Sequence, residues 1–145
     1  MRSLPLGIRL GLVAAISIGA GGAGSIADRS SVSEGRVVVV QMVGDATGFR
    51  FSPATVTVKR GDRVKWIMAS GAPHNVAFWP DSIPAGAAKK LGARMPKTMA
   101  PLTGPLLMAT NESYEVSFDD LPKGTYRYFC TPHLALGMKA VVRVE

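Results

Sequence analysis

From Gly35 to the end of the chain, short β-strand patterns follow one another with glycine and proline between them. The β-branched run at 36–43 suits a buried first strand, and the segments 54–59 and 63–70 alternate between apolar and polar side chains. Three more strand patterns close the chain, at residues 113–118, 125–130 and 139–145. About eight short strands with turn residues between them predict an all-β fold, a Greek-key β-sandwich.

The segment between residues 80 and 112 does not share this pattern. It is rich in proline and glycine and its apolar residues have no strong period, so only a short helical turn is expected, around Ala85–Leu91. Lys89 and Lys90, with Arg94 and Lys97, form the densest positive stretch after the N-terminal segment. We expect an excursion from the sandwich that carries positive charge.

The first 27 residues have the order of a secretory signal. Arg2 and Arg9 precede an apolar run that is short for a membrane span, and small residues follow it. The prediction is therefore a signal peptide over 1–27, with an uncleaved membrane anchor as the alternative, a flexible linker over 28–35 and one domain over 36–145. The protein is expected in the periplasm or at the outer face of the cytoplasmic membrane.

The charge of the chain favours an acidic partner. It has 17 basic and 10 acidic residues, a formal charge of +7, and removal of the two arginines in residues 1–27 leaves 15 minus 10, or +5. Such a balance steers encounters with acidic surfaces. No dense Lys/Arg run with interleaved aromatic residues is present, which argues against nucleic acid as the partner.

The candidate chemistry lies around the single cysteine. Cys130 ends a strand pattern, one of only two histidines, His133, follows three residues later, and Met138 follows Gly137, which lets the chain turn back. One cysteine excludes an internal disulfide and an all-cysteine zinc site. With the other histidine, His74, the set becomes two imidazoles, a thiolate and a thioether, the ligands of blue-copper electron-transfer sites.

Each residue also has a plainer interpretation. Cys130 and Met138 could simply fill the core, His133 could be a surface imidazole, and His74 could be a loop residue. An enzyme is disfavoured, because further copper centres would need histidines that the chain lacks. A copper carrier or buffer without an electron-transfer role would present the same ligands and stays the alternative function.

Four stretches resemble the plastocyanin group of cupredoxins. They are FSPATVTVKRGDRVKW, PHNVAFWPDSIPAG, TYRYFCTPHLALGM and the final KAVVRVE, at residues 51–66, 73–86, 125–138 and 139–145. The resemblance implies a mobile type 1 copper electron-transfer protein with one copper ion bound by His74, Cys130 and His133 and a long axial bond from Met138. It also implies a hydrogen bond between the loops from Asn75 to Thr131, and a backbone N–H directed at the Cys130 sulfur.

The same resemblance suggests how partners dock. An edge of His133 is expected at the surface, within an apolar ring that includes Leu134, Leu136 and Pro73. Phe129 stands where plastocyanins usually carry tyrosine. Since the nearby excursion is basic, the predicted partner of this monomer is an acidic redox protein, with Lys89 and Lys90 contributing to docking.

Overall fold

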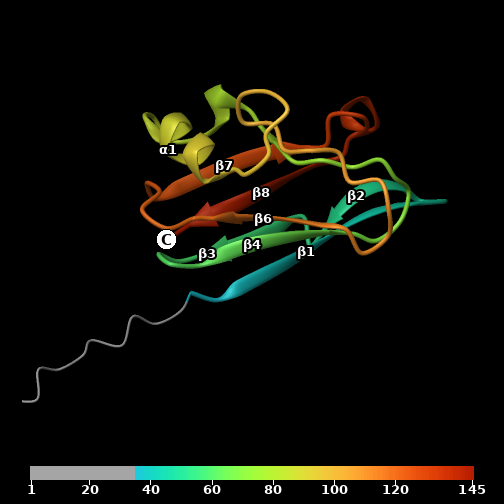
Figure 1. Cartoon of the computed structure of the whole chain (residues 1–145), viewed down its shortest axis with the longest axis horizontal. Coiled ribbons are helices and arrows are strands. Elements are labelled where there is room, and N and C mark those ends of the chain that lie inside the picture. Colours follow the sequence, from blue (N-terminus) through green and yellow to red (C-terminus); the bar gives the residue numbers. More distant parts are fainter. Residues whose placement is uncertain (1–34) are drawn as a thin grey trace, which may run out of the picture. The chain divides into compact units, whose positions relative to one another are not determined.

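The computed structural model describes residues 35–145, so the expected signal segment and all but Gly35 of the expected linker lie outside the described residues. Within this part, eight strands form two sheets of four (Figure 1). The first sheet has the spatial order β2 (Gly48–Ser52), β1 (Val37–Asp45), β4 (Arg63–Met68) and β6 (Ser113–Ser117). The second has the order β3 (Thr55–Val58), β8 (Lys139–Val144), β7 (Gly124–Phe129) and β5 (Ala77–Phe78). The predicted β-sandwich is confirmed.

Alternating side chains of both sheets build the core between them. β1 pairs with β4 and β3 with β8 in parallel, and the other pairs are antiparallel. In β7, Tyr126 and Tyr128 are buried, as the period of a strand requires, and the Tyr126 hydroxyl donates a hydrogen bond to the Pro122 carbonyl at 2.7 Å. The Trp66 ring from β4 packs edge-on against Tyr128, with centroids 5.4 Å apart. The core therefore fixes β7, the strand that leads into Cys130.

The excursion between β5 and β6 contains two short helices, η1 (Pro80–Ser82) and α1 (Ala87–Arg94). The helix begins two residues later than the turn expected around Ala85–Leu91, because Gly86 adopts a left-handed φ of 75° and ends the preceding turn. It ends before Met95, whose extended backbone is the conformation favoured before a proline. Ala87 and Leu91 anchor α1 on the core.

The two ends of the sandwich differ in what they carry. α1 and the C-terminus lie at one end of β7 and β8, whereas the loop between these strands, with the short helix η2 (Leu134–Leu136), lies at the other (Figure 1). The Lys90 ammonium contacts the Asp120 carbonyl, just before β7, while Cys130 comes just after it. Six strand residues span about 20 Å. Lys89 and Lys90 are thus far from Leu134 and Leu136, with which the sequence analysis had grouped them as docking residues.

No helix within residues 35–145 has the length and apolar character that crossing a bilayer requires.

Candidate metal centre

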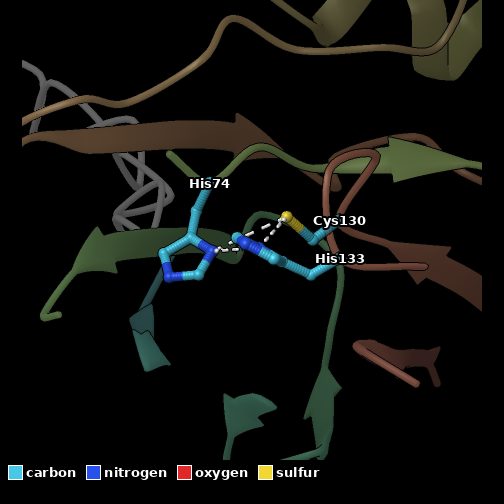
Figure 2. A group of neighbouring side chains, drawn as sticks. All are labelled: His74, Cys130 and His133. Carbon is cyan, nitrogen blue, oxygen red and sulfur yellow. Dashed lines mark hydrogen bonds between the residues drawn. The ribbon is translucent and has the colours of Figure 1, made fainter. Parts of the chain in front are cut away.

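Three potential ligand atoms meet at the end of the sandwich opposite α1. The Cys130 Sγ lies 3.6 Å from His74 Nδ1 and 3.5 Å from His133 Nδ1, and the two nitrogens are 3.2 Å apart (Figure 2). His74 and Cys130 are fully buried and His133 is 9% exposed. The structure therefore brings the distant imidazole of His74 to the thiol, as the sequence analysis required.

Backbone contacts hold His74 in place. Its N–H donates to the Leu107 carbonyl at 3.1 Å and its carbonyl accepts from the Leu107 N–H at 2.7 Å. The ring Nε2 lies 2.8 Å from the Ser70 carbonyl, which can only accept, so Nε2 carries the proton and the Nδ1 lone pair is directed at Cys130. Burial lowers the pKa of His74, against the opposing effect of the Ser70 carbonyl. The ring is thereby kept neutral and oriented as a ligand.

The loop before His74 is fixed on the end of β1. The Gly44 N–H donates to the Ser70 carbonyl at 2.9 Å, and the Ser70 hydroxyl donates to the Gly44 carbonyl at 3.0 Å. Gly71 has a φ of 75°, and a Cβ there would lie 2.5 Å from the Gly44 Cα. Only glycine allows this approach, which places the Ser70 carbonyl within hydrogen-bond distance of His74 Nε2.

The loop after Cys130 closes on itself. The Cys130 N–H donates to the Met138 carbonyl at 3.1 Å, and the Met138 N–H donates to the His133 carbonyl at 3.2 Å. Gly137, with a φ of 85°, provides the turn. Met138 is consequently fully buried, and its backbone is tied to both Cys130 and His133.

The surroundings of the Cys130 thiol disfavour its negatively charged form unless a cation is bound beside it. Burial raises the pKa of Cys130, and the backbone N–H groups of Asn75 and His133 oppose this only in part. The pKa of His133 is lowered by burial and then by His74. A thiolate at this position would have two neutral imidazoles beside it and, within the described residues, no basic side chain hydrogen-bonded to it, so a bound metal ion is the cation that would stabilise it.

The expected hydrogen bond between the two loops is present. The Asn75 amide donates to the Thr131 hydroxyl at 3.1 Å, and the Thr131 N–H donates to Asn75 Oδ1 at 2.7 Å. Asn75 is 2% exposed, so these bonds are largely shielded from water. They join the residue after the first histidine to the residue after the cysteine and fix the separation of the two loops.

Sequence reasoning missed Phe49, Ser70 and Leu107. The Phe49 ring stacks on the His133 ring with centroids 3.7 Å apart and planes 8° from parallel. Phe49 and Phe51 alternate with polar residues in the sequence, which indicates a strand but does not predict that Phe49 stacks on His133. No residue-type signal marks the contacts of Ser70 and Leu107 with His74, because both residues make these contacts through their backbones.

The expected docking residues are divided among three places. Leu134 and Leu136 follow His133 in η2 and are 38% and 63% exposed, and Pro73, half-buried, precedes His74. Phe129 is half-buried and packs on Trp79, with centroids 4.3 Å apart. The third place is the α1 end, with Lys89 and Lys90, described above.

These residues fit a type 1 copper ion. Two imidazole nitrogens and one thiolate sulfur, all within 4.8 Å of one another, would hold such an ion, and copper bound there would supply a one-electron couple. The neutral, oriented His74 and the rigid loop after Cys130 match the need for a preformed ligand set. The fold and the donor atoms together define a cupredoxin, a small β-sandwich that binds copper.

Comparison with known proteins leads to the same class. Residues 38–145 match the family of copper binding proteins, plastocyanin/azurin family. The chain is 36% identical over 108 residues to plastocyanin of Scenedesmus fuscus, covering 74% of this chain and 99% of the relative. It is 34% identical over 121 residues to plastocyanin of Synechococcus sp. (strain JA-2-3B'a(2-13)), covering 83% and 82%.

Solved structures agree in fold. Oxidized plastocyanin from Dryopteris crassirhizoma superposes with a TM-score of 0.56 at 31% identity, covering 74% of this chain and all of the other. Pseudoazurin from Methylobacterium extorquens AM1 gives a TM-score of 0.51 at 29% identity, covering 74% of each. The chain belongs to the plastocyanin/azurin family. It is a type 1 copper electron-transfer protein, and copper is its cofactor.

Proposed function

We propose that His74, Cys130, His133 and Met138 are the copper ligands of a mobile one-electron carrier that works outside the cytoplasm. The convergence of the two Nδ1 atoms with the Cys130 sulfur carries this proposal. Met138 is included because its backbone is tied to Cys130 and it is fully buried. When bound, copper supplies a Cu(I)/Cu(II) couple that this soft, mixed ligand set accommodates in both states.

The protein's own groups keep the centre unchanged during electron transfer. The Ser70 carbonyl holds the His74 ring, the Asn75–Thr131 pair holds the loops, and Phe49 supports His133 from one side. Because these contacts do not depend on the oxidation state, little rearrangement accompanies a change of charge at the site. Rapid transfer follows from this rigidity.

Partners are proposed to dock where His133 approaches the surface. Within residues 35–145, its Nε2 has no hydrogen-bond partner, and the exposed Leu134 and Leu136 follow it directly. An apolar contact beside a ligand ring suits small, transient interfaces. Phe129, bonded to Cys130, offers a second approach. The positive charge, including Lys89 and Lys90 at the far end, favours an acidic partner.

We also propose that the protein is a monomer without enzymatic activity. The whole chain has only two histidines, and both converge on the one centre. Residues 1–27 are proposed to direct export, with the mature chain starting after them. The mass of the protein recovered from the periplasm would distinguish a cleaved signal from a retained anchor.

Visible spectroscopy tests the ligand assignment. The copper(II)-loaded protein should show intense thiolate-to-copper absorption toward the red end of the visible range and should be reduced and reoxidised reversibly. Cys130→Ser should abolish the absorption. Met138→Leu should keep the absorption while shifting the reduction potential. Met95→Leu, at a buried methionine that caps the C-terminal end of α1, should change neither. A colourless protein that binds only Cu(I) would instead indicate a copper carrier.

A further inference from the structure

The outer face of the second sheet carries positive charge that no carboxylate of the described residues pairs with. The strands β3, β8, β7 and β5 contain three basic residues and no acidic one. Arg127, Lys139 and Arg143 are all exposed, and none forms an ion pair within residues 35–145. Their register places them together. Arg127 in β7 is opposite Val141 in β8, and Lys139 and Arg143 lie two residues before and after Val141 on the same face.

The first sheet shows the contrary arrangement. There Arg50 is paired with Asp45 at 2.8 Å, and Arg63 with Glu115 at 3.1 Å. One cation of that sheet, Lys65, forms no ion pair within the described part of the chain. The unpaired charge of the sandwich is therefore concentrated on one of its two faces.

The same face has a shallow depression, with Trp79 in its lining, on the side toward the copper end. Trp79 and Phe129 stack at a tilt of 31°, and both are half-buried. Beside them is a depression of about 210 Å³. It is lined by Ala54, Trp79, Arg127, Lys139, Ala140 and Val141. Lys139 and Ala140, which line the depression, directly follow Met138 in the chain, so whatever fills the depression lies near the copper end.

We propose that this face, with Arg127, Lys139 and Arg143 around Trp79, is the surface that orients an acidic redox protein on the carrier. The inference rests on the proposed function and names the part of the molecule that its partner contacts. Three cations without ion pairs on one sheet face attract and orient a negatively charged surface, and Trp79 adds apolar contact among them. Asp81 comes two residues after Trp79 and Glu145 two residues after Arg143, and neither is paired with these cations.

The α1 end is a weaker candidate for the same role. Arg60 and Arg94 there both contact Asp120, and Lys90 lies against its carbonyl. Much of that positive charge is therefore paired with Asp120, and the copper site lies at the other end of β7. Lys89 and Lys90 can attract an acidic partner at long range, but they lie too far from the copper end to orient the partner there.

Stopped-flow kinetics test the proposal on the copper-loaded full chain. The probe is reduced plant-type ferredoxin, a small acidic iron–sulfur protein, and the observable is bleaching of the copper absorption. The variant Arg127→Glu/Lys139→Glu is compared with Lys89→Glu/Lys90→Glu, which has the same net charge, and Lys65→Glu serves as the control on the first sheet. We expect a rate constant for the wild type that falls with salt, and a loss of about tenfold for the first variant at low salt.

The loss should disappear near 1 M salt, where charges more than about 3 Å apart are screened. Equal losses for the two double variants would show that only net charge matters and would overturn the proposal, as would a wild-type rate that does not respond to salt. Each variant must first show the unchanged absorption of the copper site. Absence of that absorption in the wild type would refute the proposed function itself, which separates the two failures.

Discussion

The two ends of the sandwich are built from opposite kinds of interaction. The copper end has buried imidazoles and a thiol held by neutral hydrogen bonds, such as those between Asn75 and Thr131. The α1 end has exposed charges, in which Asp120 contacts both Arg60 and Arg94. Arg60 is the largest cause of the lowered pKa of Asp120.

This difference predicts where the molecule tolerates change. Exposed ion pairs contribute little to the free energy of unfolding, because water and salt screen the charges and long side chains lose conformational freedom on pairing. Buried hydrogen bonds and close backbone contacts cannot be replaced by water without a shift of the chain. Substitutions at the copper end should therefore alter stability and spectrum together, whereas those at the α1 end should alter stability alone or nothing.

The largest effect is expected from Gly71→Ala, compared with Gly86→Ala. Both glycines have a φ of 75°, but a Cβ at Gly71 would lie 2.5 Å from the Gly44 Cα, and one at Gly86 meets nothing within 4 Å. Gly86→Ala should lower the free energy of unfolding by about 1 kcal/mol through backbone strain alone. Gly71→Ala should lower it by about 3 kcal/mol, because the clash adds to the strain. Urea denaturation of the metal-free proteins measures both, and equal losses would disprove the close packing of the loop on β1.

The second comparison is between Asn75→Ala and Asp62→Ala. Each side chain is buried and satisfies backbone N–H groups, Asp62 those of Arg36 and Lys59 at the α1 end. Removal of either side chain should lower the free energy of unfolding by about 2 kcal/mol, because backbone N–H groups lose their acceptor. Only Asn75→Ala should weaken copper binding, by about 10- to 100-fold, as removal of a group that orients ligands does. Competition with a chelator measures this, and weaker binding in Asp62→Ala would contradict the division between the ends.

The sequence predicted much of this site because its residue types are rare in the chain. One cysteine and two histidines leave few ways to build a metal centre. Strand alternation puts Tyr126, Tyr128 and Cys130 on one face, and the structure shows that this face is buried. The contacts of His74 with Ser70 and Leu107 could not be predicted, because carbonyl groups belong to every residue and their meeting depends on the fold. The cluster of positive charge that contains Lys89 and Lys90 can be seen in the sequence, but the end of the sandwich on which it lies cannot.

A smaller effect is expected from Phe49→Leu, with Phe129→Leu as its control. Both rings stack on an aromatic neighbour, Phe49 on His133 and Phe129 on Trp79. Each change should lower the free energy of unfolding by about 1 kcal/mol. Because only Phe49 covers a copper ligand, Phe49→Leu should shift the reduction potential measured by protein-film voltammetry, and Phe129→Leu should not. A shift of equal size in both would mean that the stack on His133 has no specific role.

The smallest effect is expected at the α1 end, from Arg94→Ala. The Arg94 guanidinium is exposed and lies 3.9 Å from Asp120, which keeps its contact with Arg60 after the substitution. The thermal unfolding transition should therefore coincide with that of the wild type at neutral pH, and so should the copper absorption. Since the pKa of Asp120 is lowered in the folded protein, any stabilisation by its partners is present at neutral pH and is lost as acid protonates it. A lower transition temperature in Arg94→Ala that persists in high salt would show that Arg94 acts through packing, and the α1 end would then resemble the copper end more than its exposed charges suggest.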